Sequence, residues 1–243
     1  MPLLHRAIFA WLALVLTGIP ANAAEFSEVR PIGFSADGSV FAFEEFGVQD
    51  GSGFPFASRF FIDTATDSFL PGSAVRIIID DENKSVADAR AAAAAQSGDL
   101  EEKYNFSANP GVIAAFNPFS ELDGNAHQLR YLPLSVVPAF FKPYAAQLTE
   151  KPLPSSQACN SITETRLGFR LEMTEVEGKP VSILLHEDSS LPESRHCPTG
   201  YRLGGVVTHY ADGIWTHAFL VLFQSFGFEG EHGRWMAVTR RFE

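Results

Sequence analysis

Residues 29–69 read VRPIGFSADGSVFAFEEFGVQDGSGFPFASRFFIDTATDSF, and this stretch decides the fold class. Asp37 and Gly38 form a turn signal, because Asp supplies a side-chain hydrogen bond and Gly supplies the positive φ of tight hairpin turns. The aromatic-rich residues 40–46 predict the strand that follows this turn. Residues 50–53 then predict a flexible polar loop before a second strand at residues 60–63. The stretch therefore predicts antiparallel hairpins.

Similar strand patterns continue through the rest of the chain. Residues 168–176 alternate apolar and polar side chains, and residues 180–185 run back after a turn, which predicts a further hairpin. Further predicted strands are residues 74–79, 128–132, 202–208, 217–225 and 234–242. Seven prolines between residues 105 and 154 exclude long helices there, since each internal proline costs a helix about 3 kcal/mol.

One helical pattern interrupts the strands. Residues 87–96 are rich in alanine, the best helix former, and Ser85 precedes Asp88 by three positions as in a capping box. Gly98 predicts the end of this helix, and residues 99–103 predict a second helical turn. The helix is small on one side and polar on the other, so we expect it to lie across a sheet edge.

The chain is thus predicted to be mainly β, built from antiparallel sheets and hairpins with one Ala-rich helical insertion. Residues 24–156 are interpreted as an N-terminal β lobe that includes the helix and a Pro-rich connector. Residues 157–243 are interpreted as a C-terminal antiparallel β lobe. The roughly 220 residues after the leader suffice for one large domain or two small ones.

Residues 1–23 have the features of a secretory signal peptide. His5 and Arg6 give a positive start, the apolar residues 7–18 are shorter than the about 20 that a bilayer span needs, and small residues stand at positions 21 and 23. The sequence therefore predicts an exported protein, periplasmic or secreted, with no membrane span after signal removal.

The charge of the chain limits its partners. The formal net charge is −11, and removal of the leader with its single Arg6 leaves 17 basic against 29 acidic residues, or −12. That charge argues against nucleic acid and against anionic membrane surfaces, and it favours a soluble monomer. The remaining partner classes are a small molecule or a protein of the cell envelope.

Cys159 and Cys197 are the only cysteines. In an exported chain two cysteines predict one disulfide, here across a sequence separation of 38 residues; two free thiols are the alternative.

His186 and Asp188 directly follow a predicted strand, where functional loops often begin. A histidine with a carboxylate suits acid–base chemistry or part of a metal site, but zinc takes about four ligands and no His-x-His spacing is present. A hydrolase would use Ser189 or Ser194, yet no Gly-x-Ser-x-Gly motif surrounds them. The alternative is a polar loop whose Asp188 and Ser189 side chains bond backbone groups. No metal and no cofactor is predicted.

A second candidate site is the loop after the first aromatic strand. Asp50 and Ser52 offer oxygen ligands, but calcium takes about six to eight of them, and a hairpin loop explains the glycines equally well. Phe54 and Phe56 beside this loop are candidate binding residues, because exposed aromatics there would form a ligand or partner surface.

Residues 32–70 resemble one blade of a TolB-type or WD40-like propeller, through the order of the Phe34-Ser35-x-Asp37-Gly38 turn, an apolar strand, a loop and a strand ending in Ile62-Asp63. A partial repeat of this order follows Ala211-Asp212-Gly213. A propeller needs several such units, so a partial blade within one of two β lobes and a pair of unrelated hairpins remain alternatives.

Several segments together resemble a family of predicted secreted bacterial proteins of unknown function. They include Gly33-Phe34-Ser35-x-Asp37-Gly38, residues 43–55, Gly168-Phe169-Arg170-Leu171, residues 185–188, Cys197-Pro198-x-Gly200-Tyr201-Arg202 and Gly227-Phe228-Glu229-Gly230. The resemblance implies export and supplies no activity or catalytic residues. We therefore expect a non-enzymatic binding or envelope-associated protein. The alternatives are a periplasmic hydrolase or metal-dependent enzyme that uses His186 and Asp188, and a propeller-like scaffold for protein partners.

Overall fold

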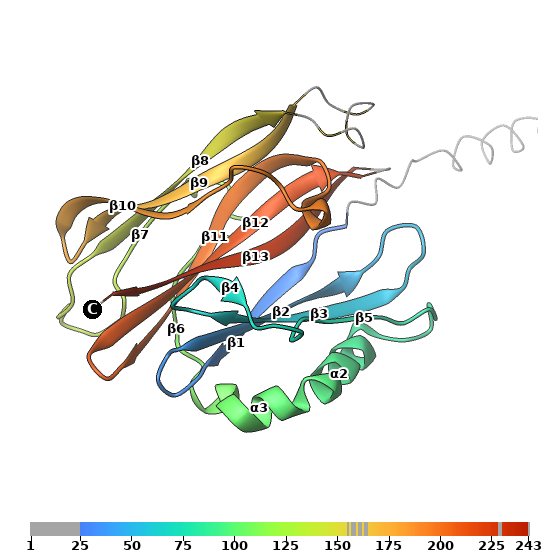
Figure 1. Cartoon of the computed structure of the whole chain (residues 1–243), viewed down its shortest axis with the longest axis horizontal. Coiled ribbons are helices and arrows are strands. Elements are labelled where there is room, and N and C mark those ends of the chain that lie inside the picture. The colour runs from blue at the N-terminus through green and yellow to red at the C-terminus, as the bar shows by residue number, and fades with distance from the viewer. Residues whose placement is uncertain are drawn as a thin grey trace, which may run out of the picture.

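Three antiparallel sheets and two helices form four layers in the computed structural model, which describes residues 25–154, 156, 159, 162, 165–227 and 230–242 (Figure 1). The prediction of a mainly β protein is confirmed. The predicted signal peptide, residues 1–23, lies outside the described residues. No helix in the described part of the chain is long and apolar enough to cross a membrane.

The N-terminal sheet holds the predicted hairpins of the first aromatic stretch. Its strands are β1 (Glu28–Phe34), β2 (Val40–Val48), β3 (Pro55–Asp63), β4 (Ser68–Phe69) and β5 (Val75–Ile78). β1 to β4 are neighbours in chain order, and β5 pairs with β3. Strands that follow one another in the chain lie side by side in this sheet because short turns, as predicted from the sequence, connect them.

The central sheet contains the last three strands of the chain together with one short strand from its middle. Its strands, in spatial order, are β13 (Glu231–Phe242), β12 (Ile214–Phe226), β11 (Pro198–Ala211) and β6 (Val112–Phe116). Phe219 and Val221 pack against the outer sheet, whereas Leu220 and Leu222 pack against the N-terminal sheet. Because both faces are covered, β12 reads as a continuous apolar run instead of an alternating one.

The outer sheet covers the other face of the central sheet. Its strands are β10 (Lys179–Glu187), β9 (Thr165–Val176), β8 (Tyr144–Pro154) and β7 (Gln128–Tyr131). Pairing of β8 with β9 and of β6 with β11 crosses the predicted lobe boundary near residue 156. The division into two lobes stays a prediction, and strands from both sides of the boundary share the outer and central sheets.

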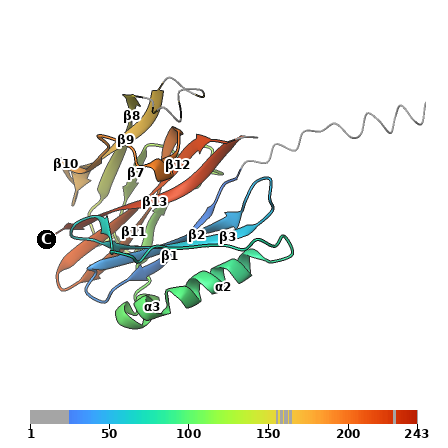
Figure 2. The same ribbon diagram turned by 45° about the vertical axis from the view of Figure 1, so that its right-hand side comes forward.

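The helices α2 (Val86–Gln96) and α3 (Gly98–Tyr104) form the fourth layer (Figure 2). The capping box is present, since the Ser85 hydroxyl accepts from the Asp88 backbone and the Asp88 carboxylate accepts from the Ser85 backbone. The expected position at a sheet edge was wrong, because α2 lies on the outer face of the N-terminal sheet. Buried Ala89 and Ala93 allow this close approach to Ala57 and Val75.

The resemblance to a propeller blade is not confirmed, and the described residues form no propeller. The two Ala-Asp-Gly turns instead close the β1–β2 and β11–β12 hairpins, and the first turn contacts β11 and β12 close to the second turn. The Thr216 hydroxyl donates to the Gly38 carbonyl across 3.4 Å, and His209 Nε2 lies 3.2 Å from the Ala36 carbonyl. Gly38 has a φ of 70°, and a Cβ on it would lie 2.8 Å from Thr216 Oγ1, so the contact needs glycine.

Candidate functional site

Cys159 and Cys197 form a disulfide with their Cα atoms 5.8 Å apart, which confirms the predicted bridge. The bridge joins the segment between β8 and β9 to the residue before β11. Between β10 and Cys197 lies the loop that carries Asp188 and the short 3-10 helix η2 (Glu193–Arg195). The disulfide therefore fixes the far end of the loop in which the sequence places the first candidate site.

His186 and Asp188 lie side by side at the end of β10. His186 Nε2 is 3.0 Å from Asp188 Oδ1, and the other carboxylate oxygen accepts from Arg195 Nη1 at 2.7 Å and from the Phe169 backbone at 3.0 Å. Burial disfavours the charged carboxylate, but these hydrogen bonds and the Arg195 charge hold the pKa of Asp188 below its ordinary value. The His186 ring stacks on Phe169 with centroids 4.7 Å apart.

The cluster around Asp188 anchors the loop. Its carboxylate connects β9, β10 and the short helix η2 through hydrogen bonds to three different residues. Ser189 and Ser194 are exposed, and within the described ranges neither makes a hydrogen bond to His186. The geometry thus brings an acid–base pair together without a nucleophile beside it.

The loop after β2 arranges its own polar groups. The Asp50 backbone donates to Glu25, the Ser52 hydroxyl donates to Gln49, and the Phe54 backbone donates to the Ser52 hydroxyl. No group of three potential metal ligands occurs among the residues that the structure describes.

The two aromatic candidates beside this loop differ in burial. Phe54 is half-buried, whereas Phe56 is buried in β3 and lies under the Arg234 guanidinium, 4.1 Å from its ring centre. Phe56 therefore contributes to the interior, and the condition of two exposed aromatics is not met.

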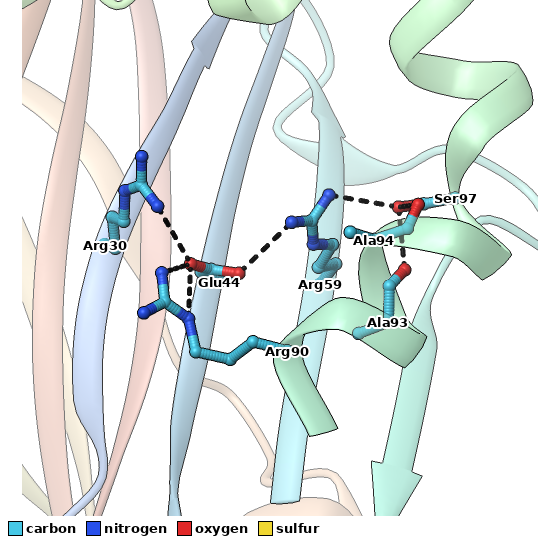
Figure 3. A network of polar contacts seen from close by, with 7 residues as sticks. All are labelled: Arg30, Glu44, Arg59, Arg90, Ala93, Ala94 and Ser97. Carbon is cyan, nitrogen blue, oxygen red and sulfur yellow. Dashed lines mark hydrogen bonds and ion pairs between the residues drawn. The ribbon is translucent and has the colours of Figure 1, made fainter. Parts of the chain in front are cut away.

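A buried carboxylate that the sequence did not single out holds α2 against the N-terminal sheet (Figure 3). Glu44 is only 1% exposed and faces the guanidinium groups of Arg30 at 3.7 Å, Arg59 at 3.4 Å and Arg90, which forms a short ion pair. Arg59 also donates to Ser97 at the end of the helix. Glu45, which follows Glu44 in β2, points to the opposite face of the sheet, as expected for adjacent strand residues, and its carboxylate accepts a hydrogen bond from the Trp235 backbone N–H.

A hollow in the described surface lies between the outer and central sheets, where β9 and β13 end and β12 begins. It has a volume of about 580 Å³ and adjoins a second hollow of about 200 Å³. The two share Tyr144, Glu177 and Trp215. The other lining residues are Val176, Ile183, Gly213, Arg240, Arg241 and Phe242 in the first, and Phe140, Phe141 and Lys142 in the second. We call the two hollows together the aromatic cleft.

The wall of the aromatic cleft is backed by a fully buried histidine. The ring of His217 lies 4.8 Å from the rings of both Tyr144 and Phe242, and its Nδ1 is 2.9 Å from the Tyr131 hydroxyl. Burial lowers the pKa of His217 to about 3 and raises that of Tyr144 to about 12, so both are neutral at pH 7. His217 Nε2 has no hydrogen-bond partner among the described residues.

Charged side chains at the aromatic cleft are mostly basic, although the chain as a whole carries −11. The lining residues include Lys142, Arg240 and Arg241 but a single carboxylate, Glu177. In the described part of the chain, none of these four forms a salt bridge. Sequence reasoning missed this site, because its residues come from separate segments of the chain.

A family model described as "Predicted secreted protein (DUF2259)" matches residues 42–241. No curated protein and no solved structure matches the chain. The matched range includes most of the β2–β3 hairpin, the disulfide and every residue that lines the aromatic cleft except Phe242, and its description agrees with the resemblance predicted from the sequence. Because the match covers well over half of the 243 residues, the protein belongs to the DUF2259 family of predicted secreted proteins.

Proposed function

We propose that the protein is an exported, non-enzymatic binding protein that holds a small organic anion with a planar or apolar body in the aromatic cleft. The observation that carries this proposal is the cleft itself. Its volume of about 580 Å³ lies within the about 300–1,000 Å³ typical of small-molecule sites. We further infer that the protein acts in the periplasm or outside the cell, as the predicted leader indicates.

The chemistry of the lining favours this class of ligand. The rings of Tyr144, Trp215 and Phe242 offer apolar area for stacking, and a guanidinium such as that of Arg240 can pair with a carboxylate, sulfonate or phosphate. His217 behind the wall is neutral at pH 7, so the positive charge that an anion would meet comes from the lysine and arginine side chains of the lining.

Titration with the fluorescent probe anilinonaphthalene sulfonate, a planar aromatic anion, tests the proposal. We expect one saturable site per chain in the folded protein, with affinity lowered about tenfold or more in Trp215→Ala and in Arg240→Gln. The matched controls are Phe69→Ala and Arg76→Gln, which change an exposed aromatic and an exposed arginine away from the cleft. No saturable binding, or equal losses in the controls, would contradict the proposal.

A second candidate function is hydrolysis with His186 as general base. The observation that favours it is the 3.0 Å hydrogen bond from His186 Nε2 to Asp188, which orients the imidazole as catalytic carboxylates do. Turnover of ester or peptide substrates that His186→Gln abolishes, while the variant keeps the wild-type unfolding midpoint, would support this function. Absence of turnover by the wild-type protein over a broad substrate panel would exclude it in favour of binding.

A further inference from the structure

A short loop between β7 and β8 exposes an unusually apolar sequence. Residues 135–142 read SVVPAFFK. Val137 is 99% exposed and Phe140 is 84% exposed, and Pro138 and Ala139 between them are exposed as well. Turns on protein surfaces normally carry polar residues and glycine, and adjacent exposed apolar side chains mark contact surfaces. We call residues 135–142 the apolar loop.

Aromatic contacts at its base hold the apolar loop in an outward position. Phe141 packs edge-on against Trp215 with centroids 5.5 Å apart, and Phe140 packs edge-on against Phe141 at the same separation. Trp215 in turn contacts Tyr210 at 4.9 Å, and Tyr210 is itself exposed. The result is a protruding tip of Val137 and Phe140 above a base of amphipathic aromatic rings.

The apolar loop lies at the end of the molecule that carries the aromatic cleft. The β9–β10 turn, the β11–β12 turn and the end of β13 lie together there in both views (Figures 1 and 2). Gly178 in the β9–β10 turn donates its backbone N–H to Pro143 directly after the loop. Lys142 belongs to the loop, whereas Arg240 and Arg241 line the adjoining first hollow, and Glu177 is the one carboxylate that lines the cleft.

We propose that this end of the protein docks on the surface of a lipid bilayer, with the tip of the apolar loop inserted into the interfacial region. A convex tip of aliphatic and phenyl groups fits the boundary between headgroups and acyl chains, and Trp and Tyr prefer the headgroup level just above it. Basic side chains beside the tip match lipid phosphates. A protein partner would require a broader buried surface than a single loop tip provides.

The overall acidity of the chain does not oppose this docking at physiological salt. Charges are screened over about 8 Å at that ionic strength, so the basic residues nearest the lipid count more than distant acids. The docking also places the mouth of the aromatic cleft at the lipid surface. The docking proposal rests on the exposed apolar loop and does not depend on which ligand occupies the cleft, so an experiment can contradict either proposal without the other.

Vesicle co-sedimentation of the full exported chain tests the docking. We expect binding to phosphatidylcholine vesicles and tighter binding to vesicles of phosphatidylethanolamine with phosphatidylglycerol. Val137→Ser with Phe140→Ser should lower the partition coefficient at least about tenfold on both, because insertion buries two large apolar side chains. Lys142→Gln should weaken binding to the phosphatidylglycerol vesicles about fivefold, the share of one basic side chain, while leaving the binding to phosphatidylcholine.

Leu122→Ser is the matched control, since Leu122 is 91% exposed but lies in the loop held by Arg202, far from Trp215 along the central sheet. This variant should bind vesicles as the wild type does. Absence of vesicle binding by the wild type, or equal loss in the control, overturns the proposal. So does a dimer that the double variant splits in the absence of vesicle binding, which would make the apolar loop an interface between two copies.

Discussion

Arg195 donates a hydrogen bond of 2.7 Å to Asp188, and both side chains are buried in the loop before Cys197. Removing one partner of a buried ion pair leaves the other charge uncompensated, at a cost of about 3–5 kcal/mol. We therefore expect Arg195→Ala to lower the free energy of unfolding by about that amount in urea titrations at pH 7. Arg166→Ala, which removes a less buried arginine bonded to a carbonyl, should cost about 1 kcal/mol or less. Similar costs for the two variants would contradict a special role for the pair.

His217 predicts an acid-sensitive stability. Its pKa is lowered to about 3 in the folded protein, whereas an unfolded histidine has a pKa of about 6.5. Between these values the unfolded chain binds one more proton, so stability falls as pH drops, by about 1.4 kcal/mol per pH unit from this group. His217→Gln should show a shallower decline of unfolding free energy from pH 6 to about pH 4. Parallel curves for wild type and variant would rule the effect out.

The disulfide predicts a large change in stability on reduction. It closes a loop with a sequence separation of 38 residues, worth about 3–4 kcal/mol by the chain-entropy estimate. We expect the unfolding midpoint to fall on reduction, with the loop around Asp188 gaining hydrogen exchange first. The double variant Cys159→Ser with Cys197→Ser should show the same midpoint with and without reductant. A wild-type unfolding midpoint that is the same with and without reductant would refute the prediction.

Loss of the Glu44 carboxylate is expected to loosen the helix α2 selectively. Glu44→Gln leaves the guanidinium groups of Arg59 and Arg90 without their anion, at a cost of about 3–5 kcal/mol. Arg30→Gln is the internal control, because Arg30 is mostly exposed and its ion pair is worth at most about 1 kcal/mol. Hydrogen exchange should rise in α2 and little in the outer sheet for Glu44→Gln. Uniform exchange across the molecule would show that Glu44 does not act through the helix.

If residues 1–23 are a signal peptide, as the sequence predicts, the mature protein has a defined N-terminus. Small residues at positions 21 and 23 follow the apolar run, so we expect cleavage after Ala23 and a secreted chain that begins at Ala24. Intact-mass measurement of the exported protein checks this. Recovery of membrane-bound protein that retains Met1 would contradict it.

Local chemistry explains which parts of the fold could be predicted. The Asp37-Gly38 turn, the Ser85 capping box and the alternation of residues 168–176 each specify structure through neighbours in sequence, and all three are present. β8 (Tyr144–Pro154) was not among the predicted strands, and it contains Pro152 and Pro154. Only residues 144–147 of β8 pair with β7. Pro152 and Pro154 lie beyond this pairing, so the missing N–H of proline leaves no β7 carbonyl without its hydrogen bond.

The layering and the cleft depend on distant segments and could not be predicted. The position of α2 is set by two buried alanines and by the pairing of Arg90 with Glu44, 46 positions apart. The aromatic cleft needs Tyr144, Trp215 and Phe242 to converge from three strands. Single-sequence patterns report which face of a strand is apolar, but they do not report which other strand covers it.

The covered central sheet has a consequence for the order in which the protein is made and exported. Phe34, Phe41, Phe43 and Phe60 belong to strands near the N-terminus, which are synthesised first, yet their partners Leu220, Leu222 and Trp235 belong to β12 and β13, which are synthesised last. Because a chain is made from its N-terminus, this aromatic face remains exposed to solvent until β12 and β13 have been made and can pack against it. The nascent protein is therefore most exposed to aggregation before its C-terminal strands are complete, and a holding chaperone that binds the emerging β2–β3 hairpin should raise its yield.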